Sequence, residues 1–140
     1  MDRISSYSSV CAMGHRSIAD ILSGVVFVEE KIDGSQFSFA RTENGMIFRS
    51  KSAIIYPEAP QAMFKSAVDT AMSLCGMLVM GWVYRGEVLC KPHHNALVYN
   101  RVPRGNVIIF DIDRADQDYL SYTEKKAECD RIGLECVPLQ

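Results

Sequence analysis

The chain has 140 residues, a formal net charge of −2, and 48% apolar and 23% charged residues. This length and balance are typical of one globular domain with a single core, and they argue against a disordered chain or a strongly basic nucleic-acid clamp. No apolar run reaches the roughly 18 residues of a membrane span, and the first residues lack the apolar core of a signal peptide. We therefore expect a single domain over residues 1–140, with no membrane attachment.

The five cysteines do not form a recognisable framework. They are odd in number and no two have CxxC spacing, so neither a disulfide network nor a zinc site is indicated. We expect a reducing, cytoplasmic environment, which for a viral protein would be the host cytoplasm.

The first part of the chain predicts a short helix followed by strands. Residues 17–22 have the length of a short helix, and the apolar run 25–28 predicts a buried strand. Residues 35–41 alternate between polar and aromatic side chains, Asn44-Gly45 is a strong signal for a tight hairpin turn, and residues 46–49 predict the returning strand. This part therefore reads as a hairpin preceded by one more strand.

The middle of the chain predicts a helix and then one strand or two. Residues 63–75 carry apolar side chains at helical spacing, and Gly76 is placed to end that helix in a left-handed conformation. Residues 77–90 predict one long strand or a pair, and residues 107–110 predict a buried strand.

The last part predicts one helix and one strand. Ser121 and Glu124 have the spacing of a capping box, Gly133 ends the helix, and residues 134–137 predict a strand. The whole pattern predicts an α+β fold with a mostly antiparallel sheet and a few helices. Because the chain stops on a predicted strand, we expect the domain to be truncated, with its next element missing.

Lys31 is the first candidate for chemistry. It follows the predicted buried strand and precedes Asp33-Gly34, a turn-forming pair. At the end of a buried strand its amine would be partly desolvated, which disfavours the ammonium form, and a neutral amine is a nucleophile. Gly34 would let the backbone approach a phosphate or a nucleoside. Alone, this motif is a weak signal, because a solvated lysine in a turn is the commoner meaning of any single match.

Three further runs carry groups that match a nucleotide. Arg49 and Lys51 end the second arm of the hairpin, where two cations would bind a triphosphate. Glu87 lies in a strand beside glycine, where it could hold a ribose hydroxyl, and Phe110 ends a buried strand with a face able to stack on a base. Each run also has an ordinary interpretation: a basic hairpin tip in water, an edge-strand glutamate and a core phenylalanine.

Taken in order, these runs resemble the covalent nucleotidyltransferase superfamily of polynucleotide ligases and capping enzymes, and within it the ATP-dependent RNA ligases. The similarity lies in Lys31-x-Asp33-Gly34, Arg49-x-Lys51, Gly86-Glu87 and Phe110-Asp111. Residues 91–103 are similar to phage and viral RNA ligase-like proteins, and the likeness covers about residues 15–137. The resemblance implies a ligase- and capping-enzyme-like nucleotidyltransferase fold, ATP-grasp-like, of which this chain is the N-terminal part.

The resemblance also implies a reaction. Lys31 would attack the α-phosphate of ATP, release pyrophosphate and carry a lysyl-AMP that activates RNA 5′-phosphate ends for joining. The expected ligands are ATP, Mg2+ and RNA ends. Asp111 would support the site or hold the Mg2+ ion, which would offset phosphate charge and orient the leaving group.

Eight further residues are implied to bind the nucleotide. Glu30 would read the adenine edge, and Gln36 would contact the ribose or phosphate side at a position where DNA ligases usually carry arginine. Glu87 would bind the ribose and Phe110 would stack on adenine. The implied set is Glu30, Asp33, Gly34, Gln36, Arg49, Lys51, Glu87 and Phe110.

Two motifs of the family are not found: a strand motif that contains glutamate, and a Lys-x-Lys motif whose lysines contact the α-phosphate. Lys125-Lys126 falls in the predicted last helix and is a poor substitute. An incomplete sheet presents an unpaired edge, so we expect a homodimer or a partner chain that supplies the missing motifs. Two alternatives stay open: a non-catalytic shortened module that binds nucleotide, RNA or a protein partner, and an unrelated α+β domain with a chance Lys-x-Asp-Gly.

Overall fold

A computed structural model describes all residues, 1–140, and contains one six-stranded sheet with strand order β3-β2-β1-β4-β5-β6. All neighbouring strands run antiparallel except β5 and β6, which are parallel. The predicted α+β class with a mostly antiparallel sheet is therefore confirmed. The strands are β1 (Ser35–Thr42), β2 (Gly45–Ser50), β3 (Ile54–Ile55), β4 (Val83–Val88), β5 (Val107–Asp113) and β6 (Glu135–Cys136).

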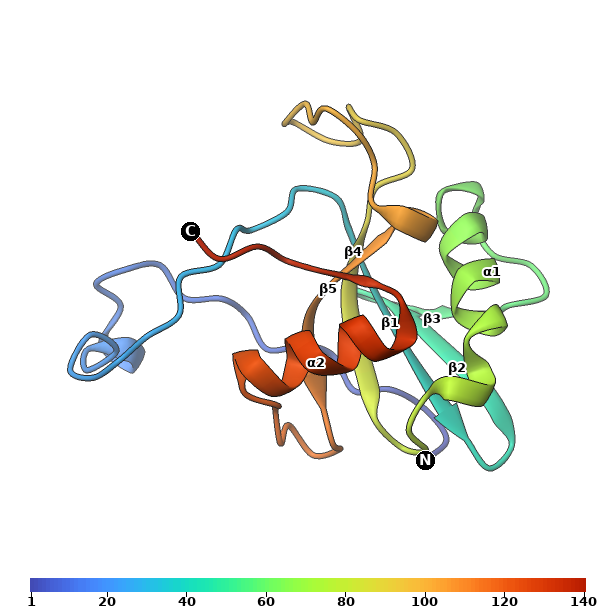
Figure 1. Cartoon of the computed structure of the whole chain (residues 1–140), viewed down its shortest axis with the longest axis horizontal. Helices are drawn as coiled ribbons and strands as arrows, with labels where there is room; N and C mark the ends of the chain where they lie inside the picture. The colour runs from blue at the N-terminus through green and yellow to red at the C-terminus, as the bar shows by residue number, and fades with distance from the viewer.

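Two α-helices, α1 (Lys65–Ser73) and α2 (Tyr122–Ile132), cover one face of this sheet (Figure 1). Four 3-10 helices join the larger elements: η1 (Arg16–Ile18), η2 (Ala62–Phe64), η3 (Cys75–Met77) and η4 (Arg104–Asn106). None of the helices has the length and apolarity that a bilayer-spanning helix needs.

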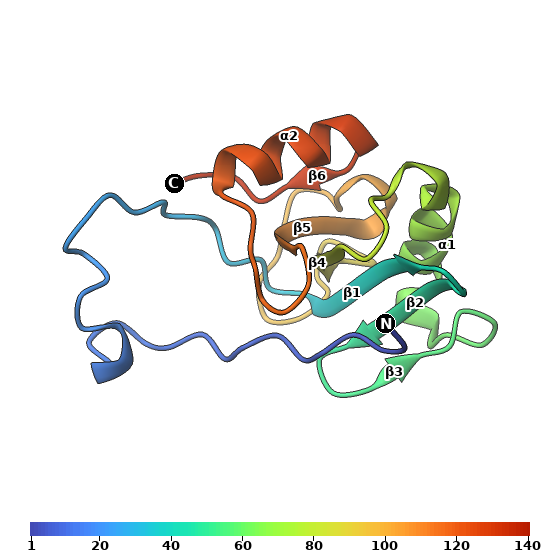
Figure 2. The same ribbon diagram turned by 90° about the horizontal axis from the view of Figure 1, so that it is seen from below.

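The main core lies between the sheet and the two helices. Alternate residues of a strand point to the same face, so Phe37 and Phe39 of β1 both face the helices. They pack in one cluster with Val68 of α1 and Cys129 and Ile132 of α2, and all five are buried. The opposite face is left to other parts of the chain, and Figure 2 shows the N-terminal segment passing on the side of the sheet away from α2.

The β1–β2 hairpin forms as predicted. Phe39 pairs with Phe48, and the turn closes with Thr42 opposite Gly45. Gly45 has φ of 112°, a conformation that L side chains rarely adopt, and the Thr42 hydroxyl donates a 2.7 Å hydrogen bond to the Gly45 carbonyl. The turn residue and the hydroxyl therefore fix the register of β1, on which the candidate site depends.

The predicted buried strand over residues 25–28 is wrong. These residues form no strand, and Val25 is 96% exposed. Strand β1 already has β2 and β4 as neighbours, so the apolar run has no free edge of that strand to join. Only its end is paired, where the Val28 carbonyl accepts a 2.8 Å hydrogen bond from the Gln140 N–H.

Other element boundaries differ from the prediction in smaller ways. The expected helix over residues 17–22 is only the 3-10 turn η1, and the strand predicted within residues 77–90 is the single strand β4. Helix α1 ends at Ser73, with Leu74 as its right-handed C-cap, so Gly76 does not end it in a left-handed conformation and instead lies in η3. A glycine near a helix end is a signal that neighbouring packing can override.

The ends of α2 agree with the prediction. Ser121 and Glu124 form a reciprocal capping box, and Gly133 caps the other end with φ of 81°. Both signals are local, which is why sequence alone was sufficient for them.

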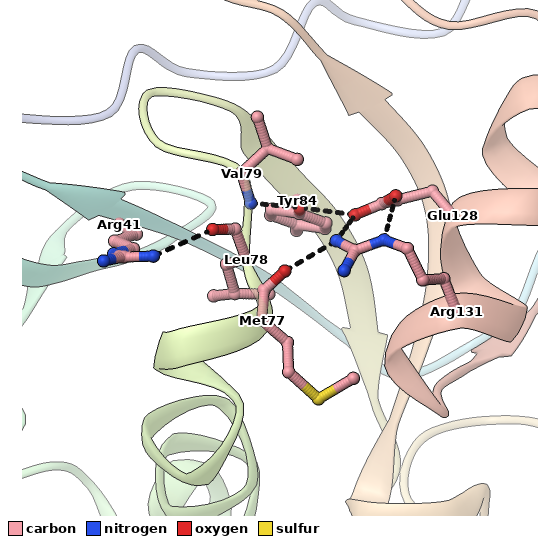
Figure 3. Close-up of polar contacts among 7 residues, drawn as sticks. All are labelled: Arg41, Met77, Leu78, Val79, Tyr84, Glu128 and Arg131. Carbon is pink, nitrogen blue, oxygen red and sulfur yellow. Dashed lines mark hydrogen bonds and ion pairs between the residues drawn. The ribbon is translucent and has the colours of Figure 1, made fainter.

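A polar network fastens α2 to β4 and to the turn before it (Figure 3). The Tyr84 hydroxyl donates a 2.8 Å hydrogen bond to Glu128 and accepts one of 3.0 Å from the Val79 N–H. Arg131 donates to Glu128 as well, and to the Met77 carbonyl. Burial alone would raise the pKa of Glu128, but the Arg131 and Tyr84 donors lower it below its ordinary value. The network lies on the helix side of the sheet and holds β4 in place.

Candidate nucleotide site

The sheet face opposite the helices carries the polar residues that the sequence singled out. Gln36 of β1 pairs in register with Glu87 of β4, and Ser38 of β1 pairs with Arg49 of β2. These residues alternate with Phe37, which faces the helices, so they share the other face. Gln36, Arg49 and Glu87 are therefore brought onto neighbouring strands of one face, and all three are half-buried.

The turn that carries Lys31 is attached to this face by its backbone. The Gly34 N–H donates a 2.9 Å hydrogen bond to Glu87 Oε2. A Cβ atom at Gly34 would lie 2.2 Å from the Val88 carbonyl oxygen, so only glycine fits. The close approach that Gly34 allows in this structure is thus between β4 and the turn. Ile32, in the same turn, is buried in a small apolar cluster with Leu89, Ile108 and Val137.

Lys31 itself is exposed, and this differs from the expected desolvation. The expectation depended on a buried strand before it, and residues 25–28 form none. The side chain of Lys31 makes no hydrogen bond or ion pair, so its amine is free. The neighbouring Glu30 is half-exposed and is fixed through its backbone N–H, which donates to the Pro138 carbonyl.

Charges gather around Glu87. Burial raises the pKa of this carboxyl, whereas the Gly34 N–H and the positive charges of Lys31 and Lys51 act to lower it. Glu87 Oε2 accepts from the Gly34 N–H, and Oε1 makes no hydrogen bond within the chain. Lys51 is exposed and directly follows the last residue of β2. The result is a half-buried carboxylate with one unbonded oxygen, on which the positive charges of Lys31 and Lys51 act.

Arg49 adds a third cation and an unsatisfied donor. Its Nη1 donates a 3.4 Å hydrogen bond to the Ile4 carbonyl, and its Nε is buried with no partner. A buried N–H without an acceptor costs free energy, and such groups in native proteins call for an explanation. An anionic ligand at this face would supply the missing acceptor.

Asp33 faces a loop and not the sheet. Its carboxylate accepts a 2.8 Å hydrogen bond from the Leu97 N–H and one of 3.1 Å from Asn95 Nδ2. Its own N–H donates a 2.8 Å hydrogen bond to the Tyr99 hydroxyl. The Leu97 donor, followed by further hydrogen bonds and the charge of Lys31, lowers the pKa of Asp33. The side chain implied to bind nucleotide therefore holds a loop in this structure.

Phe110 and Asp111 lie at an irregularity of β5. The β4–β5 register shifts between Arg85 and Gly86, so Phe110 is an extra residue on its strand. The ring of Tyr7 meets the Phe110 ring edge-on at 5.0 Å, and the Tyr7 hydroxyl donates a 2.8 Å hydrogen bond to Asp111 Oδ2. Burial raises the pKa of Asp111, against the effect of that hydrogen bond. Both residues thus contact the same N-terminal tyrosine.

The residues present would hold a metal ion only with help from a ligand. No group of three or more His, Cys, Asp or Glu side chains is placed to bind one. Mg2+ is commonly held by one or two carboxylates together with substrate phosphates. Asp111 would provide a single carboxylate, so it could hold Mg2+ only together with the phosphates of a bound nucleotide.

Three contacts of the site were not foreseen from the sequence. Tyr7 and Tyr99 reach it from 104 and 66 residues away along the chain, and no local pattern signals such pairs. Lys125 of α2 is buried, and its Nζ donates to Glu29 Oε2 at 2.6 Å and to the Phe110 carbonyl at 2.8 Å. The chain before Lys31 is therefore tied to α2.

The chain is similar to known proteins in family and in fold. A family model described as RNA ligase matches residues 24–140. No curated protein matches the chain. Among solved structures, a lysine-to-alanine variant of a Naegleria gruberi RNA ligase with ATP and Mn is similar, with a TM-score of 0.65 and 18% identity over 81% of this chain and 36% of that one. The same ligase with PPi gives a TM-score of 0.60 and 19% identity over 81% and 35%. The chain thus spans about a third of the length of the structures that it matches, and the likeness shows the fold.

Proposed function

Because the chain belongs to the RNA ligase family, we propose that it is the nucleotide-binding part of an ATP-dependent RNA ligase in which Lys31 takes up AMP from ATP. The observation that carries the proposal is the hydrogen bond from the Gly34 N–H to Glu87. It joins the lysine turn to the one sheet face that also presents free cations and an unsatisfied Arg49 donor.

The reaction proposed for Lys31 is a displacement at the α-phosphate. The neutral amine forms a bond from Nζ to the α-phosphorus, and the bond from that phosphorus to the bridging oxygen breaks, so that pyrophosphate leaves. The amine is exposed, so its proton can pass to solvent. The product is a lysyl-AMP, which in a ligase activates the 5′-phosphate end of an RNA for joining.

The other residues of the face would bind and orient ATP. Arg49 and Lys51 would hold phosphate oxygens, because planar guanidinium and ammonium donors both pair strongly with phosphate. Glu87 Oε1 and Gln36 would accept or donate to ribose hydroxyls, and Phe110 would pack on adenine. Asp111 would share a Mg2+ ion with the phosphates, and that ion would offset their charge and orient the leaving group.

Binding of adenine at Phe110 requires a change at Tyr7. The Tyr7 ring already contacts Phe110, and its hydroxyl already occupies one Asp111 oxygen. Tyr7 belongs to the N-terminal segment, and the part of this segment that contacts Phe110 would have to move. The proposed site is therefore assembled at the Glu87 end and covered at the Phe110 end.

A non-catalytic nucleotide-binding module is the second candidate, and the lysines of α2 favour it. Lys125 is engaged by Glu29 and the Phe110 carbonyl, and Lys126 is paired with Asp130 at 2.6 Å. Both lysines are paired within the chain, and Lys125 is buried as well. A module of this kind would bind ATP without forming a covalent product.

Labelling with α-labelled ATP and magnesium distinguishes the two candidates. The first predicts label that stays on the denatured chain, that is lost in Lys31→Ala and that persists in Lys65→Ala. Lys65 is a matched control because it is an exposed lysine on α1 that pairs only with Asp69. ATP binding without any retained label would favour the module, and label retained in Lys31→Ala would exclude Lys31 as the nucleophile.

A further inference from the structure

The turn that carries Lys31 is held by side chains from distant parts of the chain. Two consecutive N–H groups, of Asp33 and Gly34, have no backbone acceptor and donate instead to Tyr99 Oη at 2.8 Å and Glu87 Oε2 at 2.9 Å. Glu87 comes from a central strand of the sheet, whereas Tyr99 comes from the long loop between β4 and β5. The turn is therefore held from both sides.

The loop that provides Tyr99 is itself anchored. The Tyr99 N–H donates a 2.9 Å hydrogen bond to the Pro92 carbonyl, which closes the loop on itself. The Tyr99 ring packs against the apolar cluster that contains Ile32, the residue next to Lys31. Leu97 and Asn95 donate to the Asp33 carboxylate. The Tyr99 hydroxyl is thus placed by the loop, and it in turn places the Asp33 backbone.

Lys31 has no contact of its own that would fix it. Its side chain is exposed and makes no hydrogen bond, so the backbone of residues 31–34 is what sets the point from which the amine extends. A nucleophile must be held close to its target and aligned with it, and a misplacement of about 1 Å can cost about a hundredfold in rate. A contact that fixes this backbone therefore acts on the rate of attack.

We infer that Tyr99 is a positioning residue for Lys31, because its hydroxyl accepts the Asp33 N–H and sets the backbone from which the nucleophilic amine extends. The inference rests on the proposed function, since it assigns a role within that reaction. Tyr99 hydrogen-bonds to Asp33 and Pro92 and to none of Arg49, Lys51 and Glu87, so we expect its effect to be on the orientation of Lys31 and not on ATP affinity.

Tyr99→Phe tests the inference, because it removes the hydroxyl and keeps the ring in the apolar cluster. We expect the rate of lysyl-AMP formation at saturating ATP to fall about tenfold or more, with less than about a twofold change in the ATP concentration that gives half the maximal rate. Tyr56→Phe is the matched control, since Tyr56 is exposed and its hydroxyl makes no hydrogen bond. An unchanged rate in Tyr99→Phe, or a change confined to the half-maximal concentration, would overturn the inference.

A second readout does not depend on activity. Amide hydrogen exchange should show faster exchange of the Asp33 N–H in Tyr99→Phe, with the Phe37 N–H of β1 unchanged. Absence of labelling in the wild-type chain would count against the proposed function, and exchange alone would then decide on the positioning contact. Equal Asp33 exchange in both chains would show that Tyr99 does not hold the turn.

Discussion

Glu87 is the residue where folding and the proposed function make opposite demands. One of its oxygens is held by the Gly34 N–H, and burial raises its pKa above the ordinary value of 4.5. Because the folded state raises this pKa, ionisation of Glu87 costs folding free energy. The cost is absent at a pH below the ordinary pKa and grows as the pH rises through the folded-state pKa. A neutral side chain at this position would not carry this cost in folding free energy.

Glu87→Gln should therefore separate stability from nucleotide binding. The amide oxygen can still accept from the Gly34 N–H, and the cost of the buried charge is removed. We expect a free energy of unfolding at pH 7 that is equal to the wild type or up to about 1 kcal/mol higher, with any advantage lost below pH 4.5, and weaker ATP binding. Urea unfolding between pH 4 and pH 8 checks the stability, and an advantage that grows as the pH falls would contradict the sign of the pKa shift.

Tyr99 and Tyr7 show why some residues of a site cannot be predicted from the sequence. The motif order led to Lys31 and Glu87 because both lie in short runs with a known companion. The hydroxyl contacts of Tyr7 and Tyr99 join residues 104 and 66 positions apart, and nothing in their own neighbourhood distinguishes them from other tyrosines. Their contribution depends on the fold and not on local pattern.

At the level of elements, turn and capping residues correctly predicted the hairpin and the helix ends, but the apolar run 25–28 did not correctly predict a strand. The β1–β2 hairpin and the caps of α2 follow from turn and capping residues within a few positions. The run 25–28 is apolar enough for a buried strand, yet it is exposed, because whether a strand forms depends on a free neighbour in the sheet. That error also removed the reason for expecting a desolvated Lys31.

The contact between the lysine turn and β4 gives a prediction at this level. In Gly34→Ala the new methyl carbon would lie 2.2 Å from the Val88 carbonyl oxygen, so the start of β1 must move away from β4. We expect a loss of about 1–3 kcal/mol in the free energy of unfolding, together with slower AMP uptake, because the turn loses its position. Gly76→Ala is the comparison variant, because Gly76 has no positive φ and nothing lies within 4 Å of its Cβ position. Equal stability and labelling for Gly34→Ala and the wild type would contradict the close packing.

For the molecule as a whole, one sheet face is closed by helices and the other carries the proposed chemistry. The helix face holds the main core and the Tyr84 network (Figure 3). The other face is lined by two smaller apolar clusters and the N-terminal segment. The chain spans about a third of the length of the Naegleria gruberi ligase structures that it matches.

The exposed run 25–28 predicts self-association or pairing with another chain. Val25 is 96% exposed and Phe27 and Val28 are more than half exposed, which is unusual for a contiguous apolar run. We expect concentration-dependent association in light scattering, and less of it in Val25→Glu. Because the Val25 side chain is almost fully exposed, this substitution should leave the fold unchanged. Ser23→Glu adds the same charge outside the apolar run and is the control. A chain that stays monomeric at all concentrations would count against the proposed homodimer.

The most direct test of the account is to identify which residue carries AMP. The chain is incubated with ATP and magnesium, digested at neutral pH to preserve a phosphoramidate, and mapped by peptide mass spectrometry. The account predicts an AMP adduct on the peptide that contains Lys31 and none on the peptides that contain Lys51 or Lys91. An adduct on another lysine, or none while ATP is bound, would contradict the proposal that Lys31 is the nucleophile.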